Sequence, residues 1–157
     1  MSLRSNLLRI ASELPQGNQN RKKILAILKK SKPERSAADA SIDREIQAFA
    51  NEVQKMVDRH DKKVFEESGL WQQAMDQGAL HYRNITLTWG RRYAKLVQEN
   101  YAGGGSRQVF CFVDRTNGDI LKAASWKKPA KHARGNVMDR AQRGRSVGPY
   151  GANYLRA

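Results

Sequence analysis

The sequence predicts an α+β protein: N-terminal helices, then a three- to four-stranded antiparallel β-meander, then a basic, largely irregular C-terminal segment. Apolar residues recur every three or four positions as far as residue 77, a spacing typical of helices that bury one face. From residue 82 onward apolar and polar residues alternate, which indicates strands. The connections between these strands are short, and short connections join antiparallel neighbours. Helices that precede a meander favour a fold in which a long helix covers one sheet face.

Residues 1–33 are expected to form a basic amphipathic helical hairpin. Leucine and isoleucine recur at helical spacing in residues 2–13, and the proline and glycine of Leu14–Gly17 end this first helix. Asn20 opens a second helix, and Pro33 ends it. Lysine and arginine cover the remaining surface, so the hairpin could dock on a partner, on acidic lipid or on the rest of the chain.

Residues 34–40 are expected to be a linker, and residues 41–124 the α+β core. A long helix is expected to begin at Ser41 and to end near Gly69, because glycine suits the position after a helix. A short helix is expected over residues 70–77. The apolar stripe of the long helix comprises Ile42, Ile46, Phe49, Ala50, Val53, Met56 and Val57.

Four strands are predicted in the rest of this core, over residues 82–89, 93–99, 107–114 and 119–124. Asn117 and Gly118 predict a tight hairpin turn, because this pair tolerates a positive φ at both central positions. Phe110 and Phe112 are expected to pack under the long helix, since a domain with few apolar residues needs these rings in its core. Trp89 is expected in the same core.

The C-terminal segment, residues 125–157, is expected to be mostly irregular. One short helix is predicted from Pro129 to the residue before Gly135, because proline suits the first helical position and glycine the position after the last.

Charge is concentrated at the two ends of the chain. Residues 1–35 contain nine lysines and arginines against two acids, and residues 122–157 contain nine against one. Residues 36–121 are close to neutral, with eleven against twelve. A near-neutral body with two basic ends indicates that the termini hold a polyanionic partner. Nucleic acid is the simplest candidate for this partner.

The C-terminal candidates for nucleic-acid contact combine cations with an aromatic ring. They are Lys122, Trp126, Lys127, Lys128, Lys131, Arg134, Arg140, Arg143 and Arg145, and Tyr150 and Tyr154 follow them. Lysine and arginine attract phosphates, and a Trp or Tyr ring offers a face on which an unpaired base stacks. Two other interpretations stay open: a basic strap that docks on an acidic protein, and a solubilising surface.

A second group of candidates lies on or between the first two predicted strands. It comprises Arg91, Arg92 and Tyr93, with Arg83 and Lys95 beside them. Aromatic and basic residues on an exposed sheet face make a platform for bases. The alternative is that Tyr93 belongs to the core.

Several classes of function find little support in the sequence. No apolar run is long enough to span a membrane. Asp114 and Asp119 flank a turn, where aspartates commonly bond to the backbone, so we expect no metal and no cofactor. An acid–base ribonuclease that uses His81 or His132 together with a lysine is a minor alternative, because it requires two groups that converge in space. Cys111 lies between two phenylalanines and is expected to be buried and inert.

Residues 112–136 and 148–156 together resemble a group of small, uncharacterised basic proteins of tailed bacteriophages. This resemblance implies a viral context, in the host cytoplasm or the virion. The leading hypothesis is a phage-encoded, non-enzymatic protein that binds nucleic acid, DNA or RNA, with low sequence specificity. The alternative is a structural virion protein, a capsid or tail component whose basic termini strap onto acidic neighbouring subunits. The oligomeric state is left open.

Overall fold

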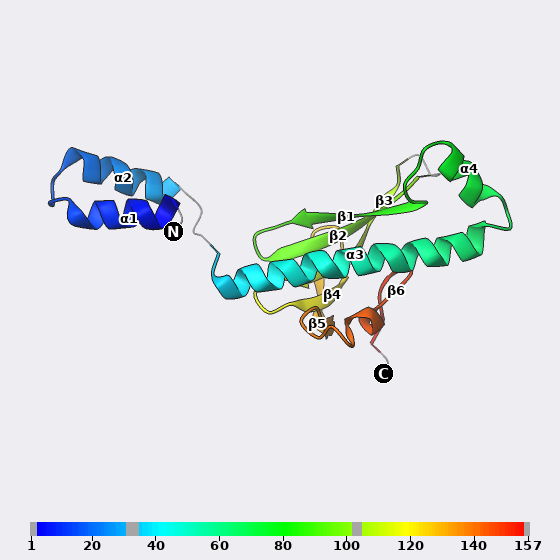
Figure 1. Ribbon diagram of the computed structural model, residues 1–157. Helices are drawn as coiled ribbons and strands as arrows, with labels where there is room; N and C mark the ends of the chain where they lie inside the picture. The colour runs from blue at the N-terminus through cyan, green and yellow to red at the C-terminus, as the bar shows by residue number, and fades with distance from the viewer. Residues whose placement is uncertain (1–2, 31–34, 102–104, 156–157) are drawn as a thin grey trace. The chain divides into compact units, whose positions relative to one another are not determined.

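The structure is a computed structural model that describes residues 3–30, 35–101 and 105–155 (Figure 1). The chain divides into two compact units, Met1–Ser36 and Ala37–Ala157. The expected linker is therefore shorter than residues 34–40, because its last four residues are helical; position 34 lies outside the described residues. Residues 125–157 belong to the second unit together with the α+β core.

The first unit contains the expected helical hairpin, α1 (Leu3–Glu13) and α2 (Gln19–Lys30). Asn18 caps α2, because its Oδ1 accepts the backbone N–H of Asn20 at 2.8 Å, so the helix opens one residue earlier than expected. The expected helix end at Pro33 lies outside the described residues. Ala11 and Leu28 are the buried apolar residues of this unit among those the structure describes.

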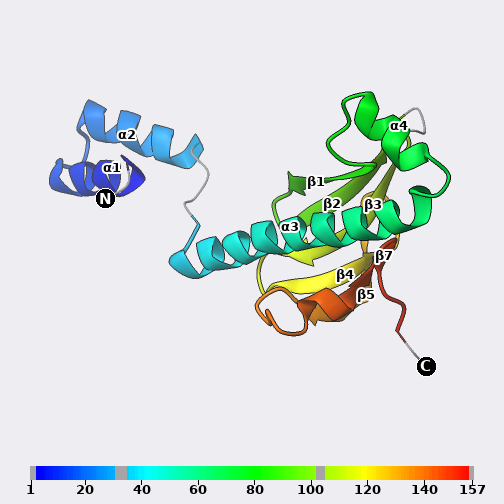
Figure 2. The same cartoon turned by 45° about the vertical axis from the view of Figure 1, so that its right-hand side comes forward.

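The second unit begins with the long helix α3 (Ala37–Phe65), followed by α4 (Leu70–Asp76). The long helix thus begins before the expected Ser41 and ends before Gly69, whereas the short helix lies where it was predicted. Figure 2 shows α3 lying across one face of the sheet. Within the described residues, no helix is long and apolar enough to cross a membrane.

The sheet is an antiparallel meander of five strands in the order of the sequence. Its strands are β1 (Arg83–Trp89), β2 (Tyr93–Asn100), β3 (Arg107–Asp114), β4 (Asp119–Ala123) and β5 (Pro129–Asn136). The α+β class is thus confirmed, as are four of the strands to within one residue at each end. The meander has one strand more than the expected maximum.

That fifth strand replaces the short helix expected from Pro129. The C-terminal segment continues with the 3₁₀ turn η1 (Arg143–Ser146) and a small hairpin of β6 (Val147–Gly148) and β7 (Gly151–Ala152), so much of it is regular. Gly135 does not end a helix. A Cβ at this position would lie 1.8 Å from Ser146 Oγ, so glycine allows β5 to pack directly on η1.

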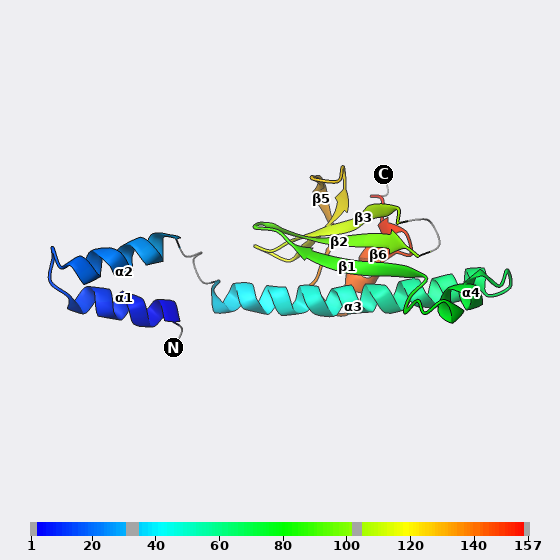
Figure 3. The same ribbon diagram turned by 90° about the horizontal axis from the view of Figure 1, so that it is seen from above.

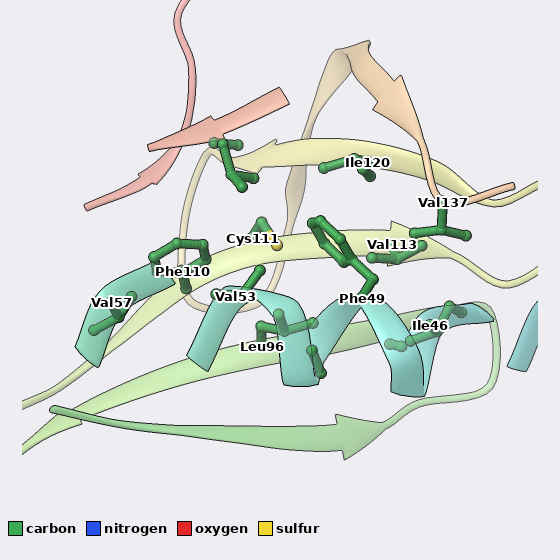
Figure 4. Close-up of a cluster of buried hydrophobic side chains, with 14 residues drawn as sticks. Ile46, Phe49, Val53, Val57, Leu96, Phe110, Cys111, Val113, Ile120 and Val137 are labelled. Atoms are coloured by element: carbon green, nitrogen blue, oxygen red, sulfur yellow. The ribbon is translucent and has the colours of Figure 1, made fainter. Parts of the chain in front are cut away.

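The hydrophobic core lies between α3 and one face of the sheet (Figure 4). The stripe predicted on the long helix supplies one half of this core, and β6 and β7 add Val147 and Ala152 to it. Its fully buried large side chains include Ile46, Phe49, Val53, Val57, Leu96, Val113, Ile120 and Val137. The predicted apolar stripe of α3 is therefore confirmed.

Three aromatic residues expected in this core have different environments. The β2–β3 register shifts between Leu96 and Val97, so Phe110 joins the core under α3 whereas Phe112 does not. Phe112 packs edge-on against Tyr93, with ring centroids 6.2 Å apart. Trp89 is at the end of β1 and is 43% exposed, so its assignment to the core is wrong.

The β3–β4 turn lies where Asn117 and Gly118 predicted it, but its form is different. Gly118 has a φ of 85°, whereas Asn117 does not have a positive φ. Four residues separate the strands, and the Gly118 N–H donates to the carbonyl of Asp114 at 2.7 Å. The glycine alone supplies the left-handed conformation that the turn requires.

Candidate nucleic-acid interface

The edge of the sheet formed by β4 and β5 carries an exposed basic surface. We call residues 119–136 the arm; Figure 3 shows it rising from the sheet on the side away from α3. Its tip consists of Trp126, Lys127 and Lys128, which are all exposed. The Ser125 hydroxyl holds this tip by accepting the backbone N–H groups of both lysines, at 3.3 and 3.1 Å.

Trp126 is 43% exposed and is fixed by a cation from β2, two strands away from β4 in the sheet. Lys95 Nζ lies 4.3 Å from the centre of the indole ring and donates to the Trp126 carbonyl at 3.3 Å. The Arg107 guanidinium lies 6.0 Å from the same ring centre. Two cations and an exposed ring thus gather at the tip of the arm, although their residues belong to separate strands.

Three lysines of the arm have no acidic partner among the described residues. Lys127, Lys128 and Lys131 are exposed, and in the described part of the chain no carboxylate lies within ion-pair distance of them. Several acids of the second unit are already paired with arginines. The three ammonium groups are therefore available to an anionic partner.

A second basic and aromatic surface lies beside the arm. We call it the arm pocket, a shallow cavity of about 590 Å³ lined by Arg134, Arg145, Asn153, Tyr154 and Leu155. Among the described residues, no carboxylate side chain lines it. Arg134 Nε donates to the Asn153 carbonyl at 2.7 Å, which fixes the arm against the residues that follow β7.

Lys122 contacts Tyr154, which lines this pocket. Its Nζ donates to the Ala152 carbonyl at 3.1 Å and lies 3.9 Å from the centre of the Tyr154 ring. Tyr154 is 81% exposed. Lys122 and Arg134 thus bond to backbone carbonyls near β7, and both side chains remain partly exposed to solvent.

Arg140 and Arg143 face α3 instead. Arg143 is buried and bonds to Glu45 and Glu52, while Arg140 bonds to Glu45 from the outer side. Hydrogen bonds from Arg140 and Arg143 lower the pKa of Glu45 to about 2. Both guanidinium groups are therefore paired with carboxylates of α3, and these pairs fasten the segment after β5 to that helix.

The candidates near the β1–β2 turn also differ among themselves. Arg91 is exposed, whereas Arg92 pairs with Asp114 at 3.1 Å and lies 5.1 Å from the centre of the half-buried Tyr93 ring. Burial raises the pKa of Asp114, but hydrogen bonds from Thr116 and Arg92 outweigh it and hold that pKa below its usual value.

Arg83 does not belong to an exposed platform. It is buried, and its Nε donates to the fully buried Asp61 of α3 at 2.7 Å. Its Nη1 donates to the Pro149 carbonyl at 2.9 Å, which ties β1 to the C-terminal segment.

The two candidate histidines, His81 and His132, lie at opposite edges of the five-stranded sheet. His81 precedes β1 and binds Asp58 through Nδ1 at 2.9 Å, whereas His132 lies on β5, at the opposite edge of the five-stranded sheet.

The two aspartates beside the β3–β4 turn bond within the turn region. Asp114 accepts the backbone N–H of Thr116 at 2.9 Å, and Asp119 accepts the side-chain amide of Asn117 at 3.1 Å. Among the described residues, no group of three His, Cys, Asp or Glu side chains could hold a metal ion. Cys111 is fully buried as expected, and this burial raises the pKa of its thiol.

The sequence did not single out Arg107 as a member of the basic surface. It lies at the start of β3, where an arginine opposite Glu99 looks like an ordinary cross-strand pair, and its distance to that carboxylate is 3.8 Å. The bend of the arm brings Trp126 to it, and no local pattern predicts that bend.

A family model matches residues 25–150, which is most of the chain. The chain belongs to DUF7717, a family of unknown function. The DUF7717 match includes the second unit as far as Tyr150, and therefore the complete arm with its tip. No curated protein and no solved structure matches the chain.

Proposed function

We propose that this DUF7717 protein is a non-enzymatic, phage-encoded protein that binds nucleic acid through the arm. The observation that carries the proposal is the tip: an exposed Trp126 stands beside Lys127 and Lys128, which lack an acidic partner in the described part of the chain. Phosphates release counterions when lysines neutralise them, and this supplies affinity for either DNA or RNA.

Low sequence specificity follows from the chemistry of this surface. Lysine ammonium groups contact phosphates as point charges, and phosphate contacts position a protein without reading bases. Arg145, which is exposed and lines the arm pocket, extends the positive field beside the arm, and the exposed Arg91 adds positive charge at the β1–β2 turn.

A charge reversal with a matched control tests the proposal. The test variant is Lys127→Glu with Lys128→Glu, and the control is Lys62→Glu with Lys63→Glu, another exposed adjacent pair, at the end of α3. Both variants change the net charge equally, so the experiment separates position from overall charge. Fluorescence anisotropy of labelled DNA and RNA at several salt concentrations gives affinity and salt slope for each protein.

We expect the arm variant to bind at least about ten-fold more weakly and to show a shallower salt slope, by roughly 0.7 to 0.9 for each phosphate that the protein no longer neutralises. The α3 variant should stay close to the wild type. Equal weakening in both variants, or no binding of any nucleic acid at low salt, would refute the proposal.

A structural virion role is a second candidate, favoured by the first unit. Leu3, Leu8, Ile10, Leu25 and Ile27 of the helical hairpin are exposed, and such a surface is suited to pack on another protein. The hairpin is strongly basic, so an acidic subunit would complement it. The phage context itself rests on the resemblance of residues 112–136 and 148–156.

Stoichiometry in purified particles distinguishes the two candidates. A structural role predicts a fixed number of copies per particle that survives nuclease treatment, with the protein in the virion. Nucleic-acid binding predicts release by nuclease, or a location in the host cytoplasm. Mass spectrometry of particles before and after nuclease measures both outcomes.

A further inference from the structure

Two lysine–aromatic pairs lie on the arm and its pocket, and they have the same construction. Lys95 Nζ lies 4.3 Å from the centre of the Trp126 ring, and Lys122 Nζ lies 3.9 Å from the centre of the Tyr154 ring. Both rings are exposed, and neither belongs to the hydrophobic core. Each pair therefore places a cation directly against one face of an exposed ring.

Exposed rings of this size are not required by the fold. The core under α3 is complete without them, and water meets 43% of Trp126 and 81% of Tyr154. The cation over each ring fixes its orientation in the free protein. An oriented, exposed ring gives up little conformational entropy when a flat partner stacks on it.

A partner that stacks on an exposed ring must offer a flat face, and single strands differ from duplexes in this respect. In a duplex the bases stack on one another and present only their edges, whereas an unpaired base offers a π-face to an aromatic side chain. The lysines of the arm tip bind phosphates as point charges in either form of nucleic acid, so the exposed ring supplies the preference for unpaired bases.

The arm pocket adds room for a second nucleotide. Tyr154 forms one side of the cavity of about 590 Å³, and Arg134 and Arg145 line it as well. A base on the Tyr154 ring would place its phosphate near these guanidinium groups, whose positive charge attracts it.

We infer that the arm and the arm pocket select unpaired nucleotides, with one base stacked on Trp126 and another on Tyr154. This inference rests on the proposed function, because it names the form of nucleic acid that the same surface takes. Lys127 and Lys128 then hold the backbone at the tip, while Lys95 and Lys122 stay against the opposite sides of the two rings.

The experiment compares Trp126 with a matched tryptophan elsewhere. Trp89 is exposed to the same extent, 43%, and likewise has a cation against its ring, Arg115 at 4.8 Å, but it lies at the far end of β1. Anisotropy titrations use an oligo(dT) 20-mer and a 20-base-pair duplex with wild type, Trp126→Ala, Trp89→Ala and Tyr154→Ala. A further variant, Trp71→Phe with Trp89→Phe, leaves Trp126 as the sole tryptophan.

We expect the wild type to prefer the single strand, and Trp126→Ala to weaken single-strand binding about ten-fold while duplex binding changes little. Tyr154→Ala should act in the same direction, and Trp89→Ala should leave both affinities unchanged. In the protein with Trp126 as the sole tryptophan, oligo(dT) should quench the fluorescence, because a stacked base quenches indole emission.

Failure of the inference is distinguishable from failure of the proposed function. Equal affinity for both oligonucleotides, with no effect of Trp126→Ala and no quenching, would overturn stacking but leave charge-driven binding intact. A preference for the duplex would also overturn it and would indicate that the arm enters a groove. Absence of binding to either oligonucleotide would refute both.

Discussion

Arg143 donates from Nη1 to Oε2 of Glu45 at 2.7 Å, although 98 residues separate them along the chain. Arg140 bonds to the same carboxylate, so the segment after β5 is fastened to the N-terminal half of α3. Arg140 and Arg143 therefore connect the C-terminal segment to α3.

Because the pKa of Glu45 is lowered in the folded protein, we expect the free energy of unfolding to decrease in acid. The Glu45 pKa in the folded protein is about 2, below the ordinary value of 4.5, so the folded state favours the charged form. This contribution is complete above about pH 4.5 and disappears as the pH falls toward 2, because the unfolded chain takes up the proton first. Urea unfolding of wild type and Glu45→Gln should show a stability difference that is constant near neutral pH and shrinks from about pH 4.5 downward. A difference independent of pH over that range would contradict the pairing.

The Arg83–Asp61 pair should be the most sensitive polar contact of the second unit. Both side chains are buried, and Arg83→Met leaves the Asp61 carboxylate buried without its partner. We expect a decrease of about 3–5 kcal/mol in the free energy of unfolding, measured by chemical denaturation. Arg91→Met is the control, because that side chain is exposed and its replacement should change stability by less than about 0.5 kcal/mol.

Gly135→Ala should destabilise the junction of β5 with η1. The new Cβ would lie 1.8 Å from Ser146 Oγ and 2.9 Å from Ser146 Cβ, a short side chain that cannot swing away. Overpacking of this kind costs about 1–3 kcal/mol, so the thermal midpoint should fall. Gly144→Ala has open space around the new Cβ and should have a small effect. Restoration of stability by Ser146→Gly in the Gly135→Ala background would identify the clash as the cause.

The C-terminal arginines should separate into two functional classes. Arg145→Gln, at the exposed arm pocket, should lower nucleic-acid affinity without changing the unfolding midpoint. Arg143→Gln, which replaces a side chain that is 4% exposed, should lower stability and have little direct effect on affinity when measured well below its unfolding midpoint. Anisotropy and denaturation on both variants measure the two effects; an equal decrease of affinity in both would contradict this division.

The local patterns in the sequence were sufficient for most elements but not for the last strand of the meander. The stripe that contains Phe49 and Val53 has a helical period, and the alternation from Arg83 to Trp89 has a strand period, so each element follows from its own residues. Residues 129–136 have neither period, and the proline and glycine near their ends suggested a helix. They form a strand because β4 offers a free edge and because Gly135 fits against Ser146, and neither condition can be read from residues 129–136 themselves.

The sequence by itself determined the α+β order of elements, the apolar face of α3 and the excess of positive charge in the C-terminal region. Only the tertiary structure decided which of those charges are available. An arginine such as Arg143 and a lysine such as Lys127 contribute equally to a sequence count, but one meets carboxylates of α3 and the other meets water. Pairing depends on the spacing of groups in three dimensions, and an electrostatic field acts on a partner only through charges that remain unpaired at the surface.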